Sequence, residues 1–186
     1  MPQKIIFSFT MAAILGLTFI ISPIISPATA GEKQTSVNKP AASAVNDITQ
    51  AAVRAGALIC ANRINQVTNF LIAGAQDVGT FIFPLTNNPN NQLFSLSMEI
   101  PLKDSASAYA SASFSSNEAN GCTGMYETVV YWPQKCAEVS EKNFGSFKKG
   151  GTLSKNITVR NSGESTKIFL MPAGAGCVSI KKELVR

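Results

Sequence analysis

The most regular feature of this sequence is an alternation of apolar and polar residues that begins near residue 78. From Phe94 to Ile100 every second residue is apolar, and residues 106–114 alternate alanine with serine or tyrosine before ending at a phenylalanine. A period of two is typical of β-strands with one face on a core, and a small alanine face suits close contact with a helix. The pattern predicts strands at residues 78–83, 93–100, 106–114, 125–132, 153–160, 167–171 and 177–185.

Before residue 78 the apolar residues instead recur at the spacing of a helix. Asn46 or Asp47 can cap its start through a side-chain oxygen, and Gly74 can end it. The apolar stripe occupies positions 48, 52, 55, 59, 60, 64, 67 and 71. We therefore expect an α+β fold with one long N-terminal helix packed on an antiparallel sheet of about six or seven strands, held by two disulfides.

The predicted strand at residues 125–132 carries apolar side chains on both faces. One face presents Tyr126, Thr128, Val130 and Trp132, and the other presents Met125, Glu127, Val129 and Tyr131. Either this strand is central and covered on both sides, or one face is a contact surface. Tyrosine and tryptophan are frequent anchors of protein interfaces, so both interpretations stay open here.

The last predicted strand follows a glycine-rich turn at Gly174 and Gly176. This turn lacks the Lys-Ser/Thr pair and the following helix of a phosphate-binding loop, so the sequence indicates a hairpin. We expect the buried face of the strand to consist of Val178, Ile180 and Leu184. Strict alternation then points Cys177 to the opposite face.

The N-terminal segment has the features of an export signal. Lys4 precedes a long uncharged apolar run, and a small-x-small motif ends at Ala30. We expect residues 1–30 to be a signal peptide, 31–42 a flexible leader and 43–186 a single α+β domain. No later stretch approaches membrane length, so we expect no stable membrane span after cleavage and a periplasmic or extracellular location.

Four cysteines, all after residue 31, predict disulfides in an oxidising compartment. Of the three ways to pair them, we favour Cys122 with Cys136 and Cys60 with Cys177. The first pair brackets one strand and one turn, and the second would join the N-terminal helix to the last strand. A zinc site is disfavoured because the cysteines lack C-x2-C spacing.

The sequence contains no histidine, which excludes catalysis that relies on imidazole. Two enzymatic alternatives remain, both histidine-free hydrolases. One would use paired carboxylates such as Glu99 and Glu127, whose separation decides the case. The other would use Ser-x-x-Lys, which occurs at Ser36/Lys39, Ser146/Lys149 and Ser179/Lys182, always outside a predicted helix.

The leading hypothesis is an exported, disulfide-stabilised, non-enzymatic binding module, such as an inhibitor, accessory or recognition protein. A structural envelope or extracellular component is the other alternative. We expect a protein or glycan partner and neither a cofactor nor a metal. We also expect no nucleic-acid partner, because the net charge of +5 is small. The candidate binding residues are Tyr126, Tyr131, Trp132, Lys148 and Lys149.

Overall fold

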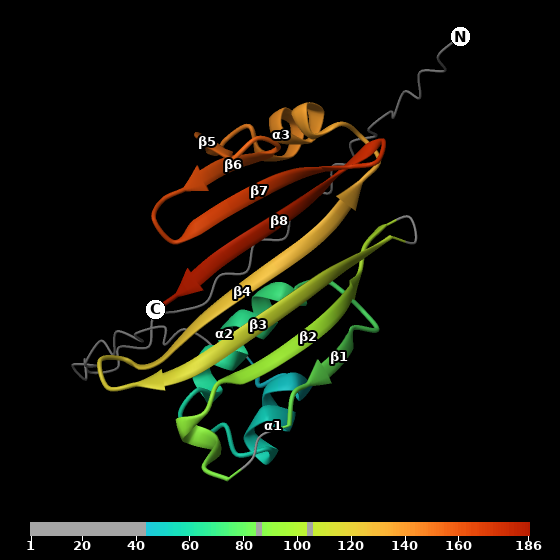
Figure 1. Ribbon diagram of the computed structural model, residues 1–186. Coiled ribbons are helices and arrows are strands. Elements are labelled where there is room, and N and C mark those ends of the chain that lie inside the picture. The colour runs from blue at the N-terminus through green and yellow to red at the C-terminus, as the bar shows by residue number, and fades with distance from the viewer. Residues whose placement is uncertain (1–43, 85–86, 104–105) are drawn as a thin grey trace, which may run out of the picture. The chain divides into compact units, whose positions relative to one another are not determined.

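The computed structural model describes residues 44–84, 87–103 and 106–186 (Figure 1). The predicted signal peptide and leader therefore lie outside the described residues. Within the described part of the chain, eight strands form one sheet in the order β1-β2-β3-β4-β8-β7-β6-β5, and every neighbouring pair is antiparallel. The strands are β1 (Gly79–Ile82), β2 (Phe94–Pro101), β3 (Ser107–Asn117), β4 (Gly121–Trp132), β5 (Lys148–Leu153), β6 (Ile157–Ser162), β7 (Thr166–Ala173) and β8 (Gly176–Val185).

The prediction of six or seven strands was wrong because of β5. Its sequence, KKGGTL, contains two glycines and reads as a loop, yet its backbone pairs with β6 through an irregularity between Lys149 and Gly151. The segment at residues 153–160, expected to be one strand, contains the turn between β5 and β6, where Ser154 has a φ of 59°. Backbone pairing here overrides low strand propensity.

The N-terminal helical region is two helices, not the single long helix that the periodicity predicts. Gly56 lies between them at a φ of 94°, which L side chains rarely adopt. Asn90 holds the break, because its Oδ1 accepts hydrogen bonds from the N–H groups of Leu58 and Ile59 at 2.9 and 3.0 Å. Ile59, which a continuous helix would bury, is 52% exposed. The described α-helices are α1 (Asp47–Arg54), α2 (Ala61–Leu71) and α3 (Cys136–Phe144).

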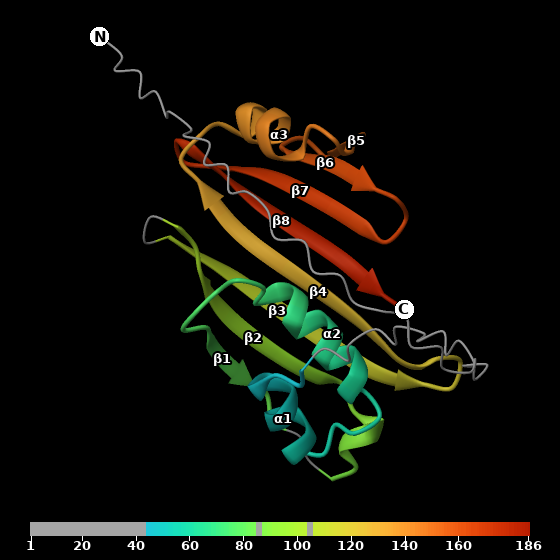
Figure 2. The ribbon, with the colours of Figure 1, turned by 180° about the vertical axis from the view of Figure 1, so that it is seen from behind.

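All three helices pack on the same face of the sheet, which we term the helix face. α2 lies over β3 and β4 (Figure 2), α1 packs against α2, and α3 packs against β7 and β8. Cross-strand partners share a face, and Trp132 pairs with Cys177, so the face that α2 covers on β4 continues to β8. The predicted inward residues of β2 and β3 are confirmed as buried, apart from Ala106, which precedes β3 and is exposed: Phe94, Leu96, Met98, Ile100, Ala108, Ala110, Ala112 and Phe114.

All four cysteines form disulfides, but the favoured pairing was wrong. Cys60 bonds to Cys122 and Cys136 bonds to Cys177, with Cα–Cα distances of 5.2 and 4.9 Å. Cys122 and Cys136 cannot meet, because the extended strand from Cys122 to Trp132 spans roughly 33 Å. Each disulfide instead joins the start of a helix to the start of a strand on the helix face.

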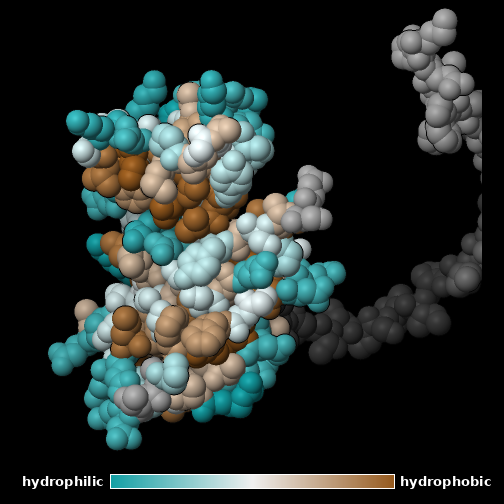
Figure 3. Space-filling view, turned by 45° about the vertical axis from the view of Figure 1, so that its right-hand side comes forward, coloured by the Kyte–Doolittle hydropathy of each residue, from teal (hydrophilic) through white to brown (hydrophobic). Residues whose placement is uncertain are grey.

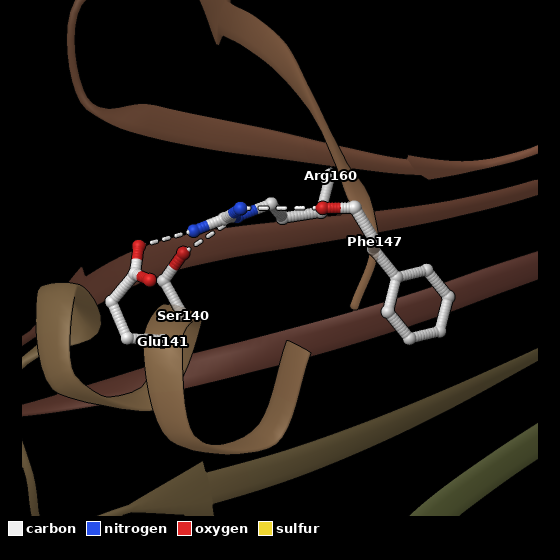
Figure 4. A network of polar contacts seen from close by, with 4 residues as sticks. All are labelled: Ser140, Glu141, Phe147 and Arg160. Atoms are coloured by element: carbon white, nitrogen blue, oxygen red, sulfur yellow. Dashed lines mark hydrogen bonds and ion pairs between the residues drawn. The ribbon is translucent and has the colours of Figure 1, made fainter. Parts of the chain in front are cut away.

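A buried arginine fixes α3 to the C-terminal strands (Figure 4). The guanidinium of Arg160, on β6, donates to Ser140 Oγ at 2.8 Å and to the carbonyl oxygen of Phe147 at 3.2 Å. It also pairs with the carboxylate of Glu141, and Arg160 itself is only 5% exposed. Because a buried cation without partners is costly, these contacts hold the helix and the segment before β5 in place.

Replacing Gly56 with alanine tests the helix break. A Cβ at this position would lie 2.5 Å from Pro89 Cγ, whereas a Cβ at Gly74, where φ is also positive, meets nothing within 4 Å. We expect Gly56→Ala to lower the free energy of unfolding by about 2–4 kcal/mol and Gly74→Ala by about 1 kcal/mol. Urea unfolding measures both, and equal losses would contradict the proposed close packing at Gly56.

Candidate functional site

In the described part of the chain, no helix packs on the sheet face opposite α1, α2 and α3, which we term the open face (Figure 1). Four apolar residues follow one another across it in register, because Val129 pairs with Ile180, Ile180 with Phe169 and Phe169 with Val159. They come from β4, β8, β7 and β6. Each is half-buried, although no described helix covers it.

A second apolar row runs beside the first. Tyr131 pairs with Val178 and Val178 with Met171, and the outer two residues are 57% and 36% exposed. In Figure 3, which views the molecule obliquely from the open-face side, apolar side chains gather in the upper part, where Figure 1 places β6, β7 and β8. We term the two rows the apolar band: Val129, Tyr131, Val159, Phe169, Met171, Val178 and Ile180.

Polar residues border the apolar band. On one side a charged row runs from Glu127 through Lys182 to Lys167, and Lys182 Nζ lies 3.2 Å from a carboxylate oxygen of Glu127. Over β2 and β3 the open face is mainly hydroxyl-bearing, and Ser95 and Ser113 share a hydrogen bond of 3.0 Å. An apolar centre with a polar rim is the usual composition of a protein interface.

The expected burial of the last strand was wrong. Val178 and Ile180 lie half-buried on the open face, and Leu184, also on that face, is 44% exposed. Cys177 and Ser179, at 0% and 3% exposed, are instead the buried residues of β8 on the helix face. Alternation separates two faces of a strand, but it does not show which face a helix covers.

The two edge strands of the sheet are poor templates for pairing with another chain. β5 carries Lys148, Lys149 and the irregularity at Gly151, and all of its residues are exposed. β1 has four residues and is followed shortly by Pro84. Lysine, short strands and local irregularity are features that protect sheet edges from unwanted pairing. The open face, not an edge, is therefore the surface suited to a partner.

The residues proposed from the sequence do not form one site. Tyr131 lies on the open face, whereas Tyr126 is 3% exposed on the helix face. Trp132 donates from Nε1 to Ser179 Oγ at 2.7 Å, and its ring packs edge-on against Phe144. Lys148 and Lys149 occupy the edge strand β5, across the sheet from the strand of the three aromatic residues.

Sequence reasoning did not single out Phe169, Met171 or Val159 as contact residues. They belong to β6 and β7, and only the strand order β4-β8-β7-β6 brings them onto one surface with the residues of β4 and β8. The alternation of residues 167–171 gave a usable signal, because Phe169 and Met171 share one face of that strand.

The helix face carries a cation cage built from this chain alone. Lys181 Nζ lies 4.9 Å from the ring centroid of Phe70 and 5.2 Å from that of Tyr126. It donates to the Tyr126 hydroxyl at 2.9 Å and lies 3.2 Å from a carboxylate oxygen of Glu183. The Tyr126 hydroxyl in turn donates to Glu183 at 2.7 Å.

The electrostatics of this cage favour a structural role over a catalytic one. Burial, and then the hydrogen bond to Glu183, raise the pKa of Tyr126 well above its usual value. Burial alone would raise the pKa of Glu183, but hydrogen bonds from Tyr126 and Lys181 outweigh it and lower that pKa. The tyrosine therefore stays protonated and the glutamate stays ionised, which is the opposite of a tyrosine general base.

The two hydrolase arrangements gain no support from the geometry. Glu99 and Glu127 both point to the open face, from β2 and β4, which are two strands apart, and they are offset along the strands by two residues. Glu99 accepts a hydrogen bond from Ser107, and Glu127 accepts one from Ser111. Ser179 and Lys182 point to opposite faces of β8, so this serine cannot use that lysine as a base.

The sequence matches no protein-family model, and no curated protein or solved structure shows significant similarity to it. Across residues 44–84, 87–103 and 106–186, no helix is long and apolar enough to cross a membrane. Within the same ranges, no three acidic or cysteine side chains are grouped so that they could hold a metal ion.

Substituting Glu183 with glutamine tests the cage. Since the pKa of Glu183 is lowered on folding, its charge stabilises the fold above the ordinary pKa of 4.5, and this contribution is lost as the pH falls through the folded value. We expect Glu183→Gln to cost roughly 1–2 kcal/mol at pH 7 and progressively less below about pH 4.5. Urea unfolding across this pH range measures the difference from the unsubstituted protein.

Glu127→Gln is the matched control, because Glu127 is as exposed as Glu183 but its partner Lys182, on the open face, is more exposed than Lys181. We expect it to cost less than about 1 kcal/mol at pH 7. A Glu183→Gln cost that does not change with pH would contradict the assigned role of the charge.

Proposed function

We propose that this protein is an exported, disulfide-stabilised, non-enzymatic binding module that docks a protein partner on the open face of its sheet. The observation that carries the proposal is the apolar band, which spans four adjacent strands and bears no helix of the described chain. Sheet faces of this composition are normally covered, either by a layer of the same chain or by another molecule.

The size of the open face suits a specific interface. Eight strands at 4.8 Å spacing and about eight residues long give roughly 34 by 26 Å, or about 900 Å². Stable interfaces of ordinary size bury about 800 Å² on each partner. The partner that fits is a protein with an apolar patch, because the band is apolar and the rim carries both charge signs at Glu127, Lys182 and Lys167.

Further observations support the export and non-enzymatic parts of the proposal. All four cysteines are paired, which is typical of proteins that fold in a periplasmic or extracellular compartment. The cation cage of the helix face holds Tyr126 protonated and Glu183 ionised, as expected of a structural network. Among the described residues, Ser179 and Lys182 point to opposite faces of β8, and Glu99 and Glu127 each accept a hydrogen bond from a different serine.

A photocrosslinking experiment in the producing cell tests the docking surface. A benzoylphenylalanine at position 169, in the apolar band, should crosslink to a discrete protein partner. The same probe at position 142, on α3, should not, because Lys142 is an exposed residue of the opposite face. Mass spectrometry identifies the crosslinked species.

A double variant makes this test specific to the apolar band. Tyr131 and Met171 are the two most exposed members of the apolar band, so replacing both with serine should cost no more than about 2 kcal/mol in the free energy of unfolding. We expect the crosslink from position 169 to fall at least about tenfold, as for loss of interface anchors. An unchanged crosslink would contradict the proposal, and a crosslink only to a second copy would favour a structural component instead.

A further inference from the structure

The open face has a pocket of about 550 Å³ at the end of the sheet where β1, β2 and β3 lie side by side. Phe81 and Tyr109 flank β2 from its two neighbouring strands, and they are 59% and 47% exposed. Glu99, on β2, pairs with Tyr109 on one side and with Gly79 on the other. Gly79 leaves the space beside Glu99 free, since even a Cβ there would lie 3.7 Å from Glu99 Cβ.

This pocket has the same composition as the cage around Lys181. That cage consists of a phenylalanine, a tyrosine and a glutamate that surround one ammonium group. The pocket also presents a phenylalanine, a tyrosine and a glutamate, namely Phe81, Tyr109 and Glu99. Among the described residues that line it, Glu99 is the only charged one, so no lining residue supplies a cation.

We propose that this pocket binds the organic cation of a lysine or arginine side chain presented by the protein partner. Aromatic faces attract cations through their quadrupole, and a carboxylate adds charge complementarity. The proposal deepens the proposed function, and it rests on that function only for the origin of the cation. Sequence reasoning considered Glu99 only as half of a carboxylate pair, whereas its neighbours here are aromatic rings.

The hydrogen bonds within the pocket favour a cation over a sugar. The hydroxyls of Ser97 and Tyr109 bond to each other at 2.8 Å, and Ser107 Oγ donates to Glu99 Oε1 at 2.7 Å. These contacts use the hydroxyl proton of Ser107 and one of the two hydroxyl protons of Ser97 and Tyr109, so fewer donors remain for a sugar. No described residue donates a hydrogen bond to Glu99 Oε2, so the carboxylate of this lining residue keeps acceptor capacity for a cation.

Titration with small probes, followed by amide chemical shifts in two-dimensional NMR, tests this site without any partner. The cationic probes are N-acetyl-lysine amide and N-acetyl-arginine amide. The neutral controls are N-acetyl-norleucine amide and N-acetyl-citrulline amide, which keep size and lose charge. We expect saturable shifts in β1, at Ser97–Glu99 and at Ser107–Tyr109, with a dissociation constant on the order of 1 mM and at least about fivefold weaker binding of the neutral probes.

Variants assign the binding to the carboxylate and the rings. Glu99→Gln keeps the shape of an exposed side chain and should weaken binding of both cationic probes about threefold to fivefold. Phe81→Leu should weaken it by a similar factor, and added salt should weaken it further. Glu127→Gln, a carboxylate of the same face outside the pocket lining, should leave it unchanged.

The outcomes separate this proposal from the docking proposal. Equal binding of arginine and citrulline probes, preferred binding of a chitin-derived trisaccharide, or no effect of Glu99→Gln in a variant with an otherwise unchanged spectrum would each overturn the cation site. The cationic probes could bind as expected while the Tyr131→Ser, Met171→Ser double variant leaves the crosslink from position 169 unchanged. In that case the cation site stands and the docking surface fails. The relative strength of the lysine and arginine probes indicates which side chain the partner presents.

Discussion

The pairing of β4 with β8 is the interaction on which the rest of the structure depends. Nine consecutive residue pairs, from Gly124 with Val185 to Trp132 with Cys177, join the N-terminal half of the sheet, β1–β4, to its C-terminal half, β5–β8. The N-terminal half has the helices α1 and α2, a core cluster and one disulfide. The C-terminal half has the helix α3, a second core cluster and the other disulfide. This ladder therefore creates one continuous open face from the two halves, and the apolar band lies across their junction.

The C-terminal half shows why covalent and ionic contacts accompany the packing. Its core cluster contains four buried apolar residues, against sixteen in the N-terminal cluster, so hydrophobic burial there is small. The disulfide between Cys136 and Cys177 closes a separation of 41 residues and contributes about 4 kcal/mol in the chain-entropy model. Together with the buried guanidinium of Arg160, it fixes α3 on the helix face without using any residue of the open face.

Local pattern predicted the strands well and their environment less well. The strict alternation of β2 and β3 identified their buried residues because one face of each meets a helix that the sequence also predicted. The helix break at Gly56 escaped detection, since the apolar spacing continues through it and only the positive φ and the contact with Pro89 reveal it. β5 was not predicted because its strand conformation depends on pairing with β6 and not on its own residues. The predicted cysteine pairing was wrong because the length of β4 keeps Cys122 and Cys136 apart.

The candidate site depended on one fact that alternation does not carry, namely which face of the sheet the helices occupy. The pattern of residues 125–132 left two interpretations open, a strand covered twice or a contact surface, and the topology decides for one covered face and one open face within the described chain. The position of Cys177 indicates which face of β8 a helix covers. A disulfide between a strand and a helix requires the helix on the side of the cysteine, so the half-buried apolar residues Val178 and Ile180 had to lie on the other side. A disulfide-bonded cysteine that points away from the apolar residues of its strand therefore indicates that the helix of the same half does not cover those apolar residues. Such an uncovered apolar face is where a binding partner is expected.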